Sequence, residues 1–138
     1  MAQAAKKAAS DRHGSKGASV GETEIPRDYN FAADILSRNL KAGRANKPAF
    51  IDSRASWTYG QLADRVNRFG AALRARGIRR EERIFLCMLD SIDWPTAFLG
   101  AIKAGVIPVA ANTLLTESDY EFMLTDSRAR LLVVSQAL

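Results

Sequence analysis

One stretch of this chain, residues 84–116, restricts its fold more than any other part of the sequence. It begins with an unbroken apolar run from Ile84 to Leu89, which is typical of a strand buried on both faces of a sheet. A helical spacing of apolar residues follows, and Gly105 is placed to end that helix in a left-handed conformation. The next apolar run is Ile107 to Ala110. We therefore expect two parallel strands joined by a right-handed helical crossover.

The crossover helix carries signals at its start and along its apolar side. Ser91 can cap its N-terminus, and Pro95 is tolerated in the first turn, where the missing N–H would have no partner. The apolar side comprises Trp94, Ala97, Phe98, Ala101 and Ile102. We expect Trp94 and Phe98, one turn apart, to belong to the core rather than to an aromatic binding site.

The segment before this stretch predicts a helix, a hairpin and a second helix. Residues 31–42 have the apolar spacing of a short amphipathic helix, with Asn30 as its cap. Residues 49–52 and 56–58 are two short β segments around a turn, and Trp57 and Tyr59 can pack the hairpin on the helix that follows.

The second helix of this lead-in has the clearest boundaries in the chain. Thr58 and Gln61 have the spacing of a capping box. Gly77 supplies a left-handed stop, after which Ile78 can fold back on the last turn. One apolar stripe runs along the helix through Leu62, Val66, Phe69 and Leu73.

Another helix and another strand follow the opening stretch. Thr116 and Asp119 form a second capping box, which starts a helix that ends near Asp126. Leu131 to Val134 predicts a third buried strand. The fold class is therefore α/β: a helix–hairpin–helix lead-in and then βαβαβ, the first and incomplete part of a doubly wound, mainly parallel sheet domain.

The composition of the chain predicts where its domain begins and in which cell compartment it lies. Residues 1–25 are rich in Ala, Lys, Ser and Gly and predict a disordered leader, with a mitochondrial-type presequence as the alternative. Residues 26–138 then form one truncated domain. No apolar run approaches the roughly 18 residues of a membrane span, so we expect no membrane partner. The single cysteine, Cys87, fits a reducing compartment, and we expect a cytoplasmic protein in which this thiol is buried and inert.

The net charge of +5 is concentrated in the middle third of the chain. We interpret the arginines there as a solvated helix face, with a surface for another protein segment or an anionic ligand as the alternative. No aromatic residues lie between them for base stacking, so nucleic acid is not an expected partner. These arginines are Arg65, Arg68, Arg74, Arg76, Arg79 and Arg80.

The carboxyl ends of the predicted strands, where open α/β sheets bind ligands, lack the residues of a recognisable catalytic site. They are Asp90-Ser91, Ala111-Asn112-Thr113 and Ser135-Gln136, without histidine, lysine or a glycine cluster. Neither the G-x-G-x-x-G fingerprint nor the G-x-x-x-x-G-K-[ST] phosphate loop is present. The only histidine, His13, lies in the predicted leader, and metal-ligand spacing is absent.

The remaining candidates have structural explanations. Asp90 and Asp93 lie at a helix N-terminus, where the helix dipole favours negative charge. Asn112 and Thr113 either line a cleft or, as we favour, cap the next helix. We therefore expect no catalytic, cofactor-binding or metal-binding residue in this chain.

Several segments, read together, resemble the N-terminal end of the adenylate-forming superfamily of acyl-CoA synthetases, with order and spacing kept from about Tyr29 to Leu138. Three further segments are similar to benzoate–CoA ligases in particular: Tyr29 to Ala32, Asp93 to Phe98, and Asn112 to Thr116. The superfamily segments are Lys47 to Asp52, Trp57 to Leu62, Val66 to Phe69, Ala72 to Ile78, and Phe98 to Val109.

This resemblance implies a two-step, AMP-forming ligase. ATP and an aryl carboxylate such as benzoate would give an acyl-adenylate, and CoA would then give the thioester, with Mg²⁺ neutralising phosphate charge. The family's phosphate loop, adenine and ribose contacts and catalytic lysine all lie downstream of this segment. The resemblance therefore implies a fragment that is inactive alone, and a homodimer is a possible state of the complete protein.

Two alternatives remain open at the level of sequence. The chain could be a non-catalytic binding or interaction module derived from the same fold, which would melt cooperatively by itself. The complete protein could also be a ligase for another carboxylic acid.

Overall fold

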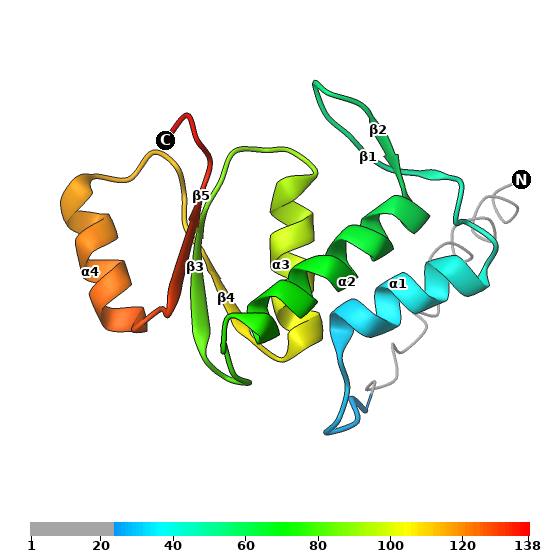
Figure 1. Cartoon of the computed structure of the whole chain (residues 1–138), viewed down its shortest axis with the longest axis horizontal. Helices are drawn as coiled ribbons and strands as arrows, with labels where there is room; N and C mark the ends of the chain where they lie inside the picture. Colours follow the sequence, from blue (N-terminus) through cyan, green and yellow to red (C-terminus); the bar gives the residue numbers. More distant parts are fainter. Residues whose placement is uncertain (1–23) are drawn as a thin grey trace, which may run out of the picture.

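The structure, a computed structural model, describes residues 24–138, so the predicted leader over residues 1–25 lies almost entirely outside the described residues. Four helices and five strands follow one another in the predicted order (Figure 1). They are α1 (Phe31–Lys41), β1 (Pro48–Ile51), β2 (Ser56–Thr58), α2 (Tyr59–Ala75), β3 (Arg83–Cys87), α3 (Asp93–Ala104), β4 (Ile107–Ala110), α4 (Glu117–Ser127) and β5 (Leu131–Val134).

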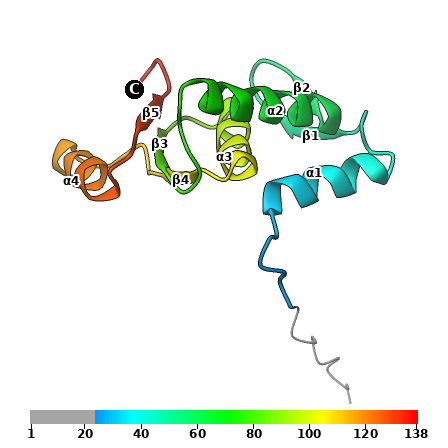
Figure 2. The ribbon, with the colours of Figure 1, turned by 60° about the horizontal axis from the view of Figure 1, so that its bottom comes forward.

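Strands β3, β4 and β5 form a parallel sheet in the order β4-β3-β5. The chain moves from β3 to one neighbour and then crosses back over β3 to the other. Right-handed crossovers in opposite directions place their helices on opposite faces. Accordingly α3 and α2 lie on one side of the sheet and α4 on the other, in both views (Figures 1 and 2). This winding confirms the α/β fold class.

The main core lies between the sheet and the α2–α3 pair. Ile84 and Leu86 of β3 are fully buried against Leu73 of α2 and against Ala97 and Ala101 of α3. Burial of such side chains contributes about 1.5–3 kcal/mol each for the larger ones. The C-terminal half of the predicted stripe of α2, through Phe69 and Leu73, and the apolar side of α3 therefore pack on the sheet.

The hairpin and α1 enclose a second, smaller core. Strands β1 and β2 pair antiparallel, as predicted. Trp57 of β2 packs, half-buried, on a cluster that includes Leu36 of α1, Leu62 and Val66 of α2, and Ile92 before α3. Helix α1, the hairpin and α2 therefore pack together against the start of α3.

Most predicted helix boundaries are confirmed. Asn30 caps α1 by accepting from the Ala33 N–H at 3.0 Å. Both capping boxes, Thr58 with Gln61 and Thr116 with Asp119, are formed in full. The two predicted helix stops, Gly77 and Gly105, adopt left-handed φ angles of 74° and 78°.

The predicted Ser91 cap is wrong. The cap position of α3 is Ile92, which has no side-chain oxygen, and Ser91 Oγ only accepts a 3.3 Å bond from the Asp93 N–H. The Ile92 N–H is instead satisfied by Asp52 of the hairpin, 40 residues earlier. A local cap is unnecessary because a tertiary contact replaces it.

The prediction that all three strands of the sheet are buried is wrong for two of them. Strands β4 and β5 have exposed residues at alternate or terminal positions, and β3 ends at Cys87, leaving Leu89 44% exposed. The physical reason is on the second face, where α4 buries none of its residues. Among residues 24–138, no helix combines the length and hydropathy that crossing a bilayer requires.

Candidate functional site

A nearly buried carboxylate, that of Asp52, joins the hairpin to the start of α3. Its side chain is 6% exposed. Oδ2 accepts from the Ile92 N–H at 3.0 Å, and Oδ1 accepts from the Trp57 indole N–H at 3.1 Å. Oδ1 also accepts from the backbone N–H groups of Arg54 and Ala55 at 2.9 and 3.0 Å. Both carboxylate oxygens are therefore engaged in fixing the backbone.

These hydrogen bonds determine the protonation state of the carboxylate. The bond from the Ile92 N–H, assisted by those from Trp57, Ala55 and Arg54, holds the pKa of Asp52 well below its usual range. Each donor stabilises the charged form, and burial opposes them with an effect smaller than that of the Ile92 bond alone. A carboxylate held in this way is a poor general acid or base near neutral pH.

Asp93 forms a second polar connection beside the first. It pairs with Arg54 of the hairpin turn at 2.8 Å and with Arg65 of α2. Arg65 also donates to Thr96 Oγ1 at 3.2 Å, and its guanidinium carbon lies 5.1 Å from the centre of the Trp57 ring. The structural interpretation of Asp93 is thus supported: it holds the hairpin, α2 and α3 together.

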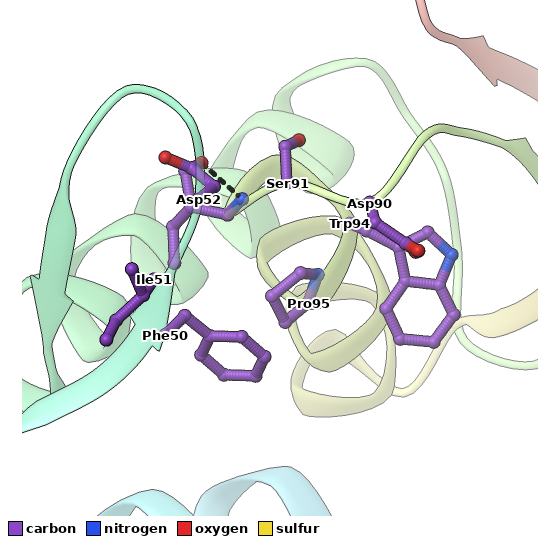
Figure 3. A pocket seen from close by; sticks show the side chains of 8 residues that line it. Phe50, Ile51, Asp52, Asp90, Ser91, Trp94 and Pro95 are labelled. Carbon is purple, nitrogen blue, oxygen red and sulfur yellow. Dashed lines mark hydrogen bonds between the residues drawn. The ribbon is translucent and has the colours of Figure 1, made fainter.

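A cavity of about 230 Å³ opens beside Asp52, near the carboxyl end of β3. Phe50 and Ile51 border it from the hairpin, and Trp94 and Pro95 border it from α3 (Figure 3). The exposed Asp90 stands at its rim. The polar side chains of the lining are Asp52, Asp90 and Ser91, and none of the residues that line this cavity is a histidine, lysine or cysteine.

A second cavity, of about 260 Å³, lies between α4 and the sheet. Cys87 and Tyr120 both line it. Burial, and then the neighbouring Cys87, raise the pKa of Tyr120, whose hydroxyl donates to the Asn112 carbonyl at 2.7 Å. Cys87 is buried and unpaired as a thiol, in line with the sequence prediction. A neutral tyrosine and a buried thiol do not form an activated pair.

The remaining candidates from the sequence are placed as follows. The favoured expectation that Asn112 and Thr113 cap the next helix is wrong, because the cap of α4 is Thr116. Asn112 instead closes a turn by accepting from the Leu114 N–H at 2.9 Å, and Thr113 lines the second cavity. Trp94 and Phe98 stack with ring centres 4.9 Å apart. His13 lies outside the described residues. The expectation that the chain supplies no site residue stays a prediction.

The arginine-rich face divides into exposed and structural members. Arg68 pairs with Asp64 on the surface of α2, and Arg79 pairs with Glu82. Arg65, in contrast, is half-buried in the polar network around Asp93. Within residues 24–138, no three potential ligand side chains come together in a way that could hold a metal ion.

Asp52 is the residue that sequence reasoning missed. Aspartate side chains often form turns by accepting hydrogen bonds from backbone N–H groups two or three residues later. Asp52 forms such a turn with the N–H groups of Arg54 and Ala55, so an aspartate between two short β segments was the available signal. It identifies the turn but contains nothing about the contact with Ile92.

Comparison with known proteins shows the family to which the chain belongs. The family model for AMP-binding enzymes matches residues 37–138, so the chain belongs to that family. Over 116 residues it is 60% identical to the benzoate–CoA ligase of Thauera aromatica, a match that covers 83% of this chain and 22% of the relative. It is 47% identical over 109 residues to the 4-hydroxybenzoate–CoA/benzoate–CoA ligase of Rhodopseudomonas palustris, covering 79% of this chain and 20% of that protein.

A solved structure gives the same result in three dimensions. The chain superposes on a benzoate CoA ligase from Burkholderia xenovorans LB400 with a TM-score of 0.76 and 53% identity, over 79% of this chain and 22% of that one. The chain therefore spans about a fifth of the length of the relatives it matches. The resemblance predicted from the sequence is confirmed, and the chain is an N-terminal segment of the fold.

Proposed function

We propose that residues 24–138 form the amino-terminal scaffold of an AMP-forming aryl-CoA ligase that acts on benzoate. The observation that carries this proposal is the 60% identity to a benzoate–CoA ligase over most of this chain. The complete protein would join benzoate to CoA through an acyl-adenylate, with ATP as the energy source.

We further propose that the sites for ATP, CoA and Mg²⁺ lie outside the described residues. The described residues contain no glycine-rich phosphate loop and no cluster that could hold a metal ion. The carboxylate of Asp52 is engaged by backbone, indole and guanidinium donors. We therefore assign the binding of these three cofactors, and the chemical steps, to parts of the complete protein beyond this segment.

Two further properties are proposals of the same kind. The single buried thiol and the absence of a disulfide in the described residues support a reducing, cytoplasmic location. A homodimer of the complete protein remains a proposal, and sedimentation of that protein would test it.

A chimaeric enzyme tests the function. In the Thauera aromatica ligase, the segment that aligns with residues 37–138 is replaced by those residues, and formation of benzoyl-CoA is measured. We expect benzoate activity within about tenfold of the parent, because a scaffold of the same class supports the same site. A folded chimaera without benzoate activity would contradict the proposal.

The control is the 138-residue chain alone. We expect no benzoate-dependent exchange of pyrophosphate into ATP, since the site lies elsewhere. Exchange by the pure chain would show that this segment contains chemistry that the geometry does not reveal. Comparison of benzoate with 4-hydroxybenzoate in the chimaera separates the two ligase specificities.

A further inference from the structure

Arginines gather at the amino end of the parallel sheet, opposite to the carboxyl ends where sheets of this class bind ligands. They come from the end of α2, the start of β3 and the connection from α4 to β5, which lie at the lower edge of the molecule (Figure 1). The Arg130 N–H donates to the Arg83 carbonyl at 2.8 Å, so the two connections lie side by side. We call the following set the arginine surface: Arg74, Arg76, Arg79, Arg80, Arg83, Arg128 and Arg130.

The arginine surface accounts for most of the net charge of the chain, which is +5. Over residues 74–83 and 126–130, seven arginines stand against three carboxylates, those of Glu81, Glu82 and Asp126. Glu82 pairs with Arg79 at 3.1 Å and lies 4.0 Å from Arg130. Among residues 24–138, no ion pair forms at the other five arginines of the surface. Their positive potential therefore extends into the solvent, over about 8 Å at physiological salt.

Part of the arginine surface is ordered before any partner binds. The Arg83 guanidinium donates from Nε to the Ser127 carbonyl at 2.8 Å, at the end of α4. The stem of Arg80 lies along Gly105, since a Cβ at that glycine would come within 3.1 Å of Arg80 Cγ. Side chains that are ordered in the free protein lose less conformational entropy on binding. The surface is therefore partly preorganised for a partner.

Exposed apolar side chains lie at the same end of the molecule. The Asn30 side-chain amide donates to the Ile102 carbonyl at 2.8 Å, which places the start of α1 beside the end of α3. At the start of β4, the Ile107 N–H donates to the Glu82 carbonyl at 2.9 Å. Arginine together with exposed aromatic side chains is typical of protein-binding surfaces. Three large apolar side chains here are 43%, 46% and 47% exposed: Tyr29, Phe31 and Ile107.

We propose that the arginine surface, with Tyr29, Phe31 and Ile107 beside it, binds an acidic segment of another protein in which apolar residues lie among the carboxylates. A guanidinium group donates two parallel hydrogen bonds to a carboxylate, so arginines match the acidic residues of such a segment. The three exposed apolar side chains match its apolar residues. Because the surface lies at the amino end of the strands, the proposal is independent of the benzoate assignment.

Other anionic ligands match this surface less well. No arginine of the surface lines either of the two cavities described above, so a small free anion finds no pocket in them. Glu81 and Glu82 lie among the arginines and would repel the dense phosphates of a nucleic acid or an anionic bilayer. A protein segment can place uncharged residues opposite these two carboxylates. In addition, no aromatic residues alternate with the arginines for base stacking.

Fluorescence anisotropy of a labelled peptide tests the surface. The probe is a peptide of about 12 residues that repeats Glu-Glu-Leu, and matched peptides replace every Glu by Gln or every Leu by Ser. With the 138-residue chain at about 50 mM salt, we expect a Kd on the order of 10 µM, at least about fivefold weaker at 300 mM salt because of screening. The glutamine peptide should bind at least about tenfold more weakly. The serine peptide should bind at least about threefold more weakly, because apolar contacts are lost. Equal affinities for all three peptides would overturn the proposal.

Charge reversal places the binding on the arginine surface. Arg76→Glu with Arg128→Glu changes two exposed side chains and should weaken peptide binding at least about tenfold. Lys41→Glu with Arg44→Glu is the matched control, because it changes the net charge equally at the other end of α1, and it should weaken binding less than about twofold. Arg76→Gln with Arg128→Gln is milder to the fold and should still weaken binding at least about threefold. Equal effects at the two places would overturn the proposal, since only net charge would then matter.

The chimaera described above tests the surface within a complete ligase. We expect the chimaera to bind the Glu-Glu-Leu peptide, and Arg76→Glu with Arg128→Glu to weaken that binding at least about fivefold. A folded chimaera that does not bind the peptide overturns the proposal, because other parts of the ligase then cover the surface. Vesicles with about 30% phosphatidylglycerol and a short DNA duplex are the competing probes. Tighter binding to either at physiological salt overturns the proposal in favour of lipid or nucleic acid. A chimaera that binds the peptide but forms no benzoyl-CoA contradicts the benzoate assignment alone.

Discussion

At the scale of single residues, Asp52 is the most informative side chain. One oxygen accepts from the hairpin turn and the Trp57 indole, while the other accepts from Ile92 at the start of α3. The Arg54 guanidinium donates to the second oxygen as well, so a nearly buried carboxylate with five donors cannot be replaced by a group that donates in the same place.

We therefore expect Asp52→Asn to lower the melting temperature of the chain by about 5 °C or more. The asparagine NH₂ would face either the Ile92 N–H or the turn donors, leaving a donor without an acceptor. Thermal unfolding followed by circular dichroism measures the effect. Asp64→Asn, which removes an exposed carboxylate paired with Arg68, is the matched control and should change little.

The same carboxylate gives the chain a pH dependence. The pKa of Asp52 is lower in the folded state than its ordinary value of 3.8, so folding favours the charged form. The resulting stability is complete above the unfolded pKa and is lost as the pH falls below about 4. Urea unfolding between pH 7 and pH 3 should show this loss, and it should be smaller in Asp52→Asn. An unchanged slope in the variant would contradict the assignment.

Arg128 has a strained backbone conformation. It ends α4 with a φ angle of 51°, in the left-handed region, which costs a residue with a Cβ about 1–2 kcal/mol. Arg128→Gly should raise the free energy of unfolding by about 0.5–1 kcal/mol, after the greater flexibility of glycine in the unfolded chain is subtracted. Arg128→Ala keeps the strain and should bring no gain in urea unfolding. If both variants behave alike, the backbone is not the cause.

At the scale of elements, α2 and α3 cross through two glycines. A Cβ at Gly70 would lie 3.2 Å from the Gly100 carbonyl oxygen. A Cβ at Gly100 would lie 2.9 Å from Phe69 Cδ1 and 3.2 Å from the Val66 carbonyl. The two helices therefore approach as closely as their backbones permit, and this approach positions α2 over the core.

Gly100→Ala should destabilise the chain by about 1 kcal/mol in urea unfolding. The overpacking cost of about 1–3 kcal/mol exceeds the gain of about 1 kcal/mol in helix propensity. In a Phe69→Leu background the ring is absent, so the added methyl group should cost about 1 kcal/mol less. Additive effects of the two changes would mean that Phe69 is not the obstacle.

At the scale of the whole molecule, stability is uneven across the two faces of the sheet. The α2–α3 side contains the buried clusters, whereas α4 is attached mainly at its ends. Tyr120 donates to the Asn112 carbonyl, and the Arg83 guanidinium donates to the Ser127 carbonyl at 2.8 Å. Two polar anchors and few buried apolar groups are features of a segment that opens locally.

We expect the amides of α4 to exchange at least about tenfold faster than those of α3 in the 138-residue chain. Hydrogen exchange with mass spectrometry on peptides from both helices measures the difference. Tyr120→Phe, which removes one anchor, should increase the rate in α4 and leave α3 unchanged. Equal rates in both helices would show that the molecule opens only as a unit.

Local signals predicted the elements of this fold with few errors. Thr58 with Gln61 and Thr116 with Asp119 act over three residues, so their partners can be read directly from the chain. Gly105 likewise requires only its own φ angle. Ser91 was a good local candidate that failed, because Asp52 supplies the acceptor from 40 residues away. The capping boxes were predictable because their partners lie three residues apart, whereas the acceptor of the Ile92 N–H lies 40 residues away.

For the candidate site, the sequence gave structural explanations for Asp93 and Cys87, and the ion pairs of Asp93 and the burial of Cys87 agree with them. The sequence did not predict the cavity beside Asp52, since its walls come from the hairpin and from α3. Their meeting depends on the packing of Trp57 and Ile92 in the second core. No pattern in either segment contains that contact.

The amino-acid order alone thus determined the helices, the strands, their parallel class and the family, because capping, periodicity and motif spacing are properties of neighbouring residues. The tertiary structure alone decided how deeply each strand is buried and which oxygen satisfies the start of α3. Burial depends on what covers a face, and α4 covers the second face only in part. An apolar run such as Leu131 to Val134 is the same sequence whether its edge is open or paired.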